Sequence, residues 1–147
     1  MLIKDVLHHK GHDVATISVT ATSLEALDIL NDMHIGSLIV TDSDGELVGI
    51  LSERDILAHF RDVSDGIPVS RIMTPRDRVI VAHDGDTVEY AMSVMTEHRV
   101  RHLPVYEDDR LIGVVSIGDV MKAVSSDLKF ETKLLEDYIA GSQAIIR

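Results

Sequence analysis

The sequence predicts an α+β fold (mixed α/β) in which one β-α-β-β-α unit occurs twice and a further helix follows. Three observations lead to this prediction. Two stretches of the chain match each other at a nearly constant spacing, helical and strand-like apolar patterns follow in the same order within both, and a polar turn separates the same pair of strands in each. With 147 residues, of which 45% are hydrophobic, the two copies are expected to pack through their sheets around a shared core.

The internal repeat is the strongest of these observations. Val105 stands 65 residues after Val40, whereas Asp119 stands only 64 residues after Asp55. The missing residue falls in the turn between two predicted strands, where the four residues SDGE of the first copy face the three residues DDR of the second. Hairpin loops tolerate such a change in length, so the repeat continues through it.

The first copy contains apolar patterns of two different periods. Apolar residues recur at helical spacing after Thr22, which is a residue suited to cap a helix start, and two short apolar runs flank the polar turn. In chain order we therefore predict a strand near Val14–Ile17, a helix over 23–34, strands over 37–41 and 46–51, and a helix over 52–60.

The second copy repeats this order, and two further segments complete the chain. We predict a strand near Val79–Ala82, a helix over 88–98, strands over 102–106 and 111–115, and a helix over 117–124. A separate amphipathic helix over 127–140 is expected to end at Gly141, since glycine commonly follows a helix C-terminus. The predicted organisation is repeat one over 1–60, a connector over 61–78, repeat two over 79–125, and a C-terminal helix and tail over 126–147.

Composition and charge narrow the classes of function. The formal net charge is −11, aromatic residues make up 3% of the chain, and there is no Trp. Nucleic-acid surfaces need basic grooves and aromatic stacking faces, so we expect binding neither to nucleic acid nor to a membrane surface. The absence of Cys excludes disulfides, thiol catalysis and cysteine-based zinc sites. Because no apolar stretch is long enough to span a membrane, a cytoplasmic location is expected.

One short motif occurs in both copies. It reads Gly-x-x-Ser-x-x-Asp over Gly49–Asp55 and over Gly113–Asp119, each time where a predicted strand leads into a helix. A Ser followed three residues later by an acidic residue is a variant of the capping box, which is a purely structural role. A carboxylate at this end of a sheet is also able to accept both hydroxyls of a ribose. The two roles are compatible with each other.

The duplicated unit with this terminal motif resembles a tandem pair of CBS domains, named after cystathionine β-synthase and often called a Bateman module. The resemblance covers residues 3–125 and includes the phrases GILSERDI, MT and RHLPV, which are similar to those of stand-alone bacterial CBS-pair proteins. It implies a regulatory module rather than an enzyme. No cofactor is required, and an adenine nucleotide such as AMP, ATP or NAD is the implied ligand, with AMP expected first.

The resemblance also implies roles for particular residues. The motif Asp holds the ribose, the motif Ser lies near the ribose or phosphate, the backbone around the first strand reads the adenine, and basic residues before the second strand meet the phosphate. Carried over, the ribose-binding residues are Asp55, Asp119, Ser52 and Ser116; the adenine-binding residues are Ala15, Thr16, Ile17, Ile80, Val81 and Ala82; and two phosphate-binding residues are Arg101 and His102. The first copy has the uncharged Gly36 and Ser37 in place of that basic pair, so we expect the stronger phosphate site in the second.

Other charged or titratable residues have two interpretations. Arg54, inside the first motif, and Lys10, ahead of the first strand, are candidate phosphate ligands, and each is also consistent with an ordinary surface side chain. His8, His9 and His12 lie close in sequence. Surface histidines are a better interpretation of them than a metal site, because no acidic second shell accompanies them. We therefore predict neither a metal site nor a catalytic site.

Two functions from different classes follow from these residues. The first is a sensor of adenine nucleotides that transmits binding through the geometry of a dimer or through docking to an unknown effector protein. The second is a protein-interaction or scaffold module, in which the motif residues only cap helices and the clefts stay unoccupied. A homodimer is expected in either case, because the apolar stripes predicted over 23–34 and 88–98 are wider than one small sheet is able to cover.

Overall fold

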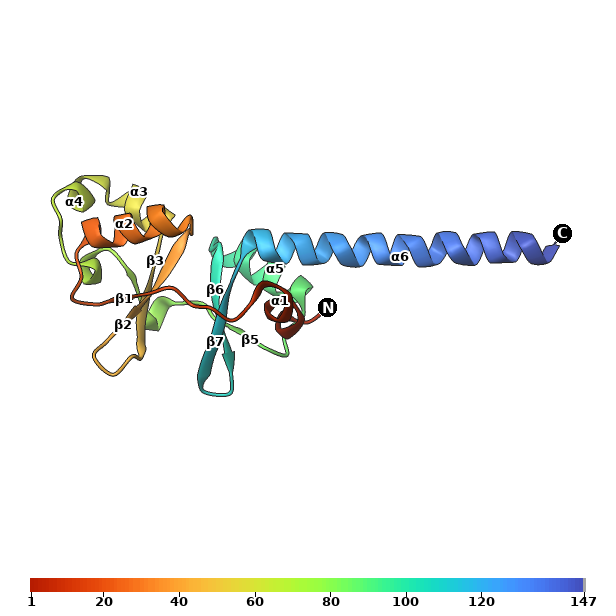
Figure 1. The fold of residues 1–147 in the computed structure, drawn as a ribbon, viewed down its shortest axis with the longest axis horizontal. Helices are drawn as coiled ribbons and strands as arrows, with labels where there is room; N and C mark the ends of the chain where they lie inside the picture. Colours follow the sequence, from red (N-terminus) through yellow and green to blue (C-terminus); the bar gives the residue numbers. More distant parts are fainter. Residues whose placement is uncertain (147) are drawn as a thin grey trace. The chain divides into compact units, whose positions relative to one another are not determined.

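The computed structural model describes the backbone of residues 1–146 and the side chains of residues 1–141 (Figure 1). The chain divides into two compact units. Residues 13–81 form one of them, which we call the Asp55 unit. Residues 1–12, together with the chain from Ala82 onward, form the other, which we call the Asp119 unit. The predicted mixed α/β fold with two small sheets is confirmed.

The Asp55 unit is built on a four-stranded sheet in the order β1-β2-β3-β4. β1 runs parallel to β2 because helix α2 connects them, and the other neighbours are antiparallel. Its core lies between this sheet and the helices, where Leu30, Leu38, Leu51 and Ile72 are buried together. The elements are β1 (Thr16–Ser18), α2 (Ser23–Met33), β2 (Ser37–Thr41), β3 (Leu47–Ser52), α3 (Glu53–Ala58), α4 (Phe60–Ser64), the 3₁₀ turns η1 (Val69–Arg71) and η2 (Arg76–Arg78), and β4 (Thr74–Pro75).

The Asp119 unit has a three-stranded sheet in the order β5-β6-β7. β5 pairs in parallel with β6 and β6 pairs antiparallel with β7, so the unit repeats the topology of the first three strands of the other sheet. Leu7, Met95 and Leu103 are among its fully buried side chains. The elements are α1 (Ile3–Lys10), β5 (Ala82–His83), α5 (Val88–His98), β6 (His102–Glu107), β7 (Arg110–Ser116) and α6 (Ile117–Ile146).

Helices α2 and α5 begin and end where the sequence predicts. Thr22 Oγ1 accepts a hydrogen bond from the backbone N of Glu25 at 3.3 Å, and Thr87 Oγ1 accepts one from the backbone N of Tyr90 at 3.0 Å. Each helix ends at a residue in the left-handed region, His34 or Arg99. The predicted hairpins are confirmed as well. Both contain a register shift at the same place, after Val40 in one and after its counterpart in the other.

The structure corrects the prediction for the C-terminal part of the chain. The helices predicted over 117–124 and 127–140 are one continuous helix, α6, and Gly141 does not end it. No proline interrupts the sequence between them, and a single glycine inside a helix costs only about 1 kcal/mol relative to alanine. Helix α6 therefore continues well past the sheet, and Leu128, Phe130 and Leu134 on it are exposed.

The first twelve residues also differ from the prediction. They form the unpredicted helix α1, and they belong to the Asp119 unit although the sequence places them with repeat one. Residues 69–78, predicted as part of the connector just before repeat two, lie in the Asp55 unit, where β4 pairs with β3. Residues 1–12 and 69–78, each of which precedes one repeat and packs with the other, are called the exchanged segments below. The segment predicted as a plain connector thus contains α4, two 3₁₀ turns and a strand. The leading strands β1 and β5 begin two to three residues later than expected.

Candidate functional site

Both copies of the predicted motif lie at the junction of a strand and a helix. Ser52 is the last residue of β3 and Asp55 lies in the first turn of α3. Ser116 is the last residue of β7 and Asp119 lies in the first turn of α6. The duplication of the sequence therefore produces two equivalent carboxylates, each at the end of a sheet strand.

The structural role predicted for the motif is confirmed. Asp55 Oδ2 accepts hydrogen bonds from the backbone N of Ser52 at 2.9 Å and from its hydroxyl at 3.1 Å. Asp119 Oδ2 accepts one from the backbone N of Ser116 at 2.8 Å, and Ser116 Oγ accepts one from the backbone N of Asp119 at 3.2 Å. One oxygen of each carboxylate is thus fixed by helix capping, which orients the other oxygen.

The motif glycines allow the exchanged segments to approach the last strand of each sheet. A Cβ atom built on Gly49 would lie 2.6 Å from the carbonyl oxygen of Thr74, and one built on Gly113 would lie 2.7 Å from Leu7 Cδ2. Each of these contacts is far below an ordinary van der Waals distance. Glycine is therefore required at position 49, where the neighbour is backbone, and is favoured at position 113, where the neighbour is the buried side chain of Leu7. The motif alone did not predict this packing role.

The exchanged segments bring different side chains to the two carboxylates. At Asp55, the hydroxyl of Thr74 lies 3.4 Å from Oδ1. At Asp119, the ammonium group of Lys10 donates to Oδ2 at 2.6 Å and also to the carbonyl oxygen of Val114 at 2.7 Å. Lys10, predicted as a phosphate ligand, is thus an ion-pair partner of the motif carboxylate in this structure.

This ion pair changes the acidity of Asp119. Partial burial of the carboxyl group, which by itself would raise its pKa, is outweighed by the hydrogen bond from Lys10, by the hydrogen bonds from Ser116 and by the charge of Lys10. The pKa of Asp119 consequently lies below its ordinary value of 3.8, and the carboxylate is ionised at neutral pH.

The predicted phosphate pair lies beside the second motif. His102 stands opposite Ser116 in the β6–β7 register, and the carbonyl oxygen of Arg101 accepts a hydrogen bond from the backbone N of Ile117 at 2.8 Å. Arg101 is exposed. The structure therefore brings the basic pair of the second copy next to its serine. In the first copy the same register places the uncharged Ser37 opposite Ser52.

The predicted adenine-reading residues fall differently in the two copies. Ala15, Thr16 and Ile17 lie at the start of β1 in the Asp55 unit, where the carbonyl oxygen of Ala15 accepts a hydrogen bond from the backbone N of Ile39 at 3.0 Å. In the second copy, Ala82 begins β5 of the Asp119 unit. Ile80 and Val81 precede that strand and end the Asp55 unit.

Arg54 and the N-terminal histidines complete the candidates. Arg54 is an exposed residue of α3, between the capping Ser52 and Asp55. His9 Nδ1 lies 3.0 Å from the carbonyl oxygen of Asp5, and His12 Nδ1 lies 2.9 Å from that of Ile112. Among the side chains that the structure describes, no three His, Cys, Asp or Glu residues gather closely enough to hold a metal ion.

A cavity of about 280 Å³ opens beside Asp119, between α1 and α6. Two lysines line it, Lys10 and Lys122, together with His9 and the carboxylates of Asp5 and Asp119. In a chain of net charge −11, this cavity gathers basic groups next to a motif carboxylate. Such a combination suits a ligand with a sugar diol and an anionic group.

Comparison with known proteins agrees with this geometry. The model of the CBS domain family matches residues 3–62 and 69–126. The chain is 35% identical over 149 aligned residues to the CBS domain-containing protein CBSX3, mitochondrial, of Arabidopsis thaliana. The alignment covers 95% of this chain and 72% of that protein. In the part of the chain that the structure describes, no helix is long and apolar enough to cross a membrane.

Solved structures show the same fold. The CBS-domain containing protein ATU1752 from Agrobacterium tumefaciens has a TM-score of 0.77 at 38% identity, over 83% of this chain and 92% of that one. CBSX2 in complex with AMP has a TM-score of 0.65 at 28% identity, over 77% of this chain and 88% of that one. The family model matches both halves of the sequence, and the first three strands of one sheet have the topology of the other, with the motif at the end of each. This chain therefore belongs to the CBS domain family and carries a tandem pair of CBS domains.

Proposed function

We propose that the chain is a regulatory module that binds a phosphorylated adenosine, with AMP as the first candidate, and that it has no catalytic activity of its own. The observation that carries this proposal is the pair of motif carboxylates, each oriented by its own serine at the end of a strand. A related structure, CBSX2, was solved in complex with AMP, which supports the same class of ligand.

The carboxylates have the chemistry that a ribose requires. A vicinal diol donates two hydrogen bonds, and an ionised carboxylate is an acceptor only, so the two groups are complementary. The described hydrogen bonds of Asp119 all go to Oδ2, which leaves Oδ1 for a ligand hydroxyl. In this proposal Asp55 and Asp119 hold the ribose, Ser52 and Ser116 orient them, and the backbone at the start of β1 and β5 reads the adenine.

The phosphate half of the proposal rests on the second copy. Arg101 and His102 lie where β6 begins, beside Ser116, whereas the first copy has no charged residue there. Charge-assisted hydrogen bonds to phosphate are about twice as strong as neutral ones, and an acidic protein must gather cations locally to hold an anion. We therefore place the stronger AMP site in the Asp119 unit, with Arg54 as a weaker candidate ligand in the other.

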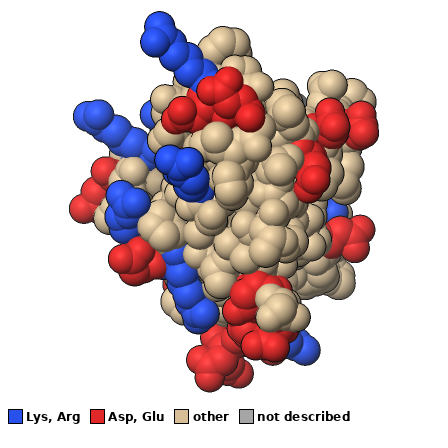
Figure 2. Space-filling model, turned by 90° about the vertical axis from the view of Figure 1, so that its left-hand side faces the viewer, with Lys and Arg blue, Asp and Glu red and all other residues tan. Residues whose placement is uncertain are grey.

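We propose that the module is a homodimer, and the helices of the Asp55 unit supply the evidence. Figure 2, which views the molecule from the side of α2, α3 and α4, shows a broad uncharged area with acidic and basic residues around it. Leu27, Leu57 and Phe60 on these helices are 41%, 74% and 68% exposed. Large apolar side chains gathered on one face in this way are typical of a surface that a second copy covers.

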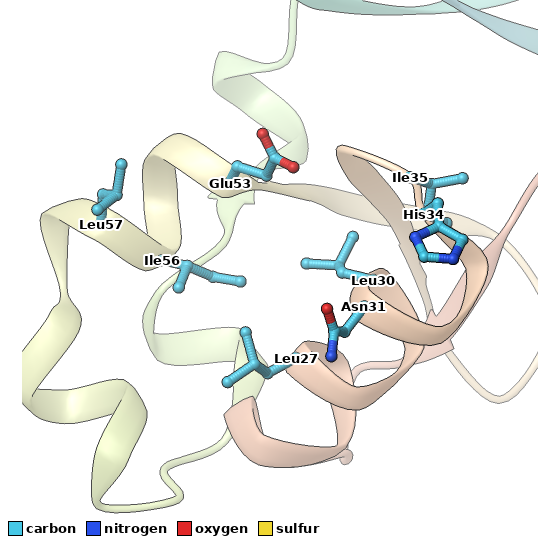
Figure 3. Close-up of a pocket in the computed structure, with 8 residues that line it drawn as sticks. All are labelled: Leu27, Leu30, Asn31, His34, Ile35, Glu53, Ile56 and Leu57. Atoms are coloured by element: carbon cyan, nitrogen blue, oxygen red, sulfur yellow. The ribbon is translucent and has the colours of Figure 1, made fainter.

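An open groove between α2 and α3 gives this surface its shape. It encloses about 510 Å³, and Figure 3 shows Leu27, Leu30 and Ile56 pointing into it from the two helices. Glu53 and His34 lie at its edge and the amide of Asn31 lies beside Leu27 and Leu30, so the lining is mostly apolar with a few polar groups. That arrangement is the usual anatomy of a protein–protein interface.

A scaffold module with unoccupied clefts is the alternative, and the helix-capping geometry of the motif is the observation that favours it. In both functions the effector protein is unknown. The cytoplasmic location expected from the sequence stays a prediction, since the plant relative CBSX3 is named as mitochondrial.

The decisive experiment is a thermal-shift panel of AMP, ADP, ATP, NAD and adenosine, followed by calorimetric titration of every ligand that raises the melting temperature. A ligand present at 100 times its dissociation constant stabilises the folded state by about 2.7 kcal/mol, which a melting curve resolves easily. Native mass spectrometry of the purified protein tests the same point through a co-purified nucleotide. Absence of any shift across the panel would favour the scaffold function.

A further inference from the structure

We infer that Lys10 makes the Asp119 site selective for phosphorylated ligands, because it occupies the ribose carboxylate in the free protein and transfers to the ligand's phosphate on binding. This inference rests on the proposed function of the Asp119 site. It concerns a residue that comes from the opposite end of the sequence, on the exchanged helix α1. If Lys10 acts in this way, the Asp119 site prefers AMP to adenosine by a larger factor than the contacts of Arg101 with the phosphate would produce alone.

The geometry of Lys10 supports the first half of the inference. Its ammonium group bonds Asp119 Oδ2 at 2.6 Å and the carbonyl oxygen of Val114 at 2.7 Å, so two acceptors compete with any other partner. The side chains of Lys10 and Asp119 are 35% and 26% exposed, which means that a ligand reaches the pair from solvent. The first hydroxyl of a ribose finds Oδ1 open, but the second hydroxyl of the diol must share Oδ2 with the ammonium group or displace it.

The chemistry of lysine supports the second half. An ammonium group on a flexible four-carbon stem is a point charge that changes partners at little steric cost. Lys10 lines the same cavity as Asp119, His9 and Lys122, so an anionic group that enters this cavity finds the displaced ammonium group within it. A phosphate ester therefore replaces the carboxylate that Lys10 gives up, whereas an unphosphorylated nucleoside offers no replacement.

The Asp55 site provides a natural comparison within the same chain. There the exchanged segment contributes the hydroxyl of Thr74, at 3.4 Å from Asp55 Oδ1, in place of an ammonium group. A ribose at Asp55 displaces a long, neutral hydrogen bond and breaks no described ion pair. The two sites are thus expected to rank adenosine and AMP differently, with the stronger preference for phosphate in the Asp119 unit and a weaker one, through Arg54, in the Asp55 unit.

The test compares Lys10→Met with Lys4→Met, a matched control that removes the same charge from the same helix at an exposed position. Both are made in an Asp55→Asn background, which weakens the first site while Asn keeps an oxygen for the cap. Calorimetric titration measures adenosine and AMP on each variant. Circular dichroism and melting curves establish that every variant is folded.

We expect Lys10→Met to bind AMP about tenfold more weakly, because a charge-assisted bond to phosphate is lost. We expect it to bind adenosine about two- to fivefold more tightly, because the competing, partly exposed ion pair is gone. Lys4→Met should leave both affinities within about twofold of the background. The opposite signs for the two ligands distinguish a ligand switch from damage to the site.

Each other outcome counts against the inference. If Lys10→Met weakens both ligands equally, Lys10 only supports the structure of the site. If Lys10→Met changes neither affinity, or if Lys4→Met changes both affinities by the same factors, the contact of Lys10 with Asp119 has no role in the choice between adenosine and AMP. If adenosine and AMP bind neither to the wild type nor to the Asp55→Asn background, the proposed function fails, and this inference fails with it. Binding of AMP by the wild type with unchanged selectivity in Lys10→Met overturns the inference alone.

Discussion

Replacing Gly113 by Ala tests the packing of the exchanged helix α1 against the sheet of the Asp119 unit. The added Cβ would lie 2.7 Å from Leu7 Cδ2 and 3.0 Å from Cδ1, and Leu7 is fully buried. Overpacking of this kind costs about 1–3 kcal/mol, and the loss of glycine from a strand returns about 0.5–1 kcal/mol. We therefore expect Gly113→Ala to lower the free energy of unfolding by up to about 2.5 kcal/mol.

Truncation of Leu7 should remove this penalty. Leu7→Ala alone costs about 2–5 kcal/mol because it leaves a cavity. In that background the clash partner is absent, so Gly113→Ala becomes neutral or slightly stabilising. The double mutant should be more stable than the sum of the single effects by about 1–3 kcal/mol, which is the overpacking cost that the truncation removes.

Urea denaturation followed by far-ultraviolet circular dichroism measures all four members of the cycle. Gly85→Ala is the matched control, since nothing lies within 4 Å of the position of its Cβ and no penalty is expected. Gly49→Ala supplies the contrast: its closest neighbour is the backbone carbonyl of Thr74 at 2.6 Å, which no side-chain truncation removes. Additive costs for Leu7→Ala and Gly113→Ala would refute the packing that places Lys10 at Asp119.

Three further predictions follow from the site and its surfaces. Arg101→Ala should weaken AMP binding about tenfold in calorimetric titration, with a smaller loss for adenosine, and equal losses would contradict its assignment to the phosphate. The lowered folded-state pKa of Asp119 predicts that wild type is more stable than Lys10→Met, with the full difference in unfolding free energy present above the ordinary pKa of 3.8. This difference should disappear as the pH falls through the lowered pKa, and urea titrations at a series of pH values measure it. Leu57→Glu should convert a dimer to a monomer in analytical ultracentrifugation at micromolar concentration, and a wild type that is monomeric with and without AMP would exclude the dimer.

The elements that the sequence predicted well are those with local causes. Helices α2 and α5 have threonine caps and apolar residues at helical spacing, and both hairpins have polar turns between short apolar runs. Capping of the motif serine by its aspartate is also local, over three residues. Such features are read from a short window of sequence, because the partners that define them are close in the chain.

Features that depend on distant partners were missed. Helix α1 has only eight residues, which are too few turns for an apolar period to stand out in the sequence. It is stabilised by burial of Ile3 and Leu7 in a unit whose other residues begin at Ala82. The contact of Lys10 with Asp119 spans 109 positions, and no periodicity or motif reports it. The continuity of α6 was missed because the end of repeat two was taken as the end of a helix, and its extension past Gly141 was missed because glycine was given more weight as a helix stop than its cost supports.

The exchange of leading segments explains why a duplicated sequence gives two unequal sites. The motif itself is the same in both copies, and its serine and aspartate adopt the same capping geometry. What differs comes from outside the motif: a neutral threonine reaches Asp55, and a lysine reaches Asp119. Because each of the exchanged segments packs on the sheet of the other copy, we expect a substitution in the first twelve residues to change the ligand preference of the second motif and to leave the first intact. On this inference, divergence of one exchanged segment separates the specificities of two carboxylates that share the same capping geometry.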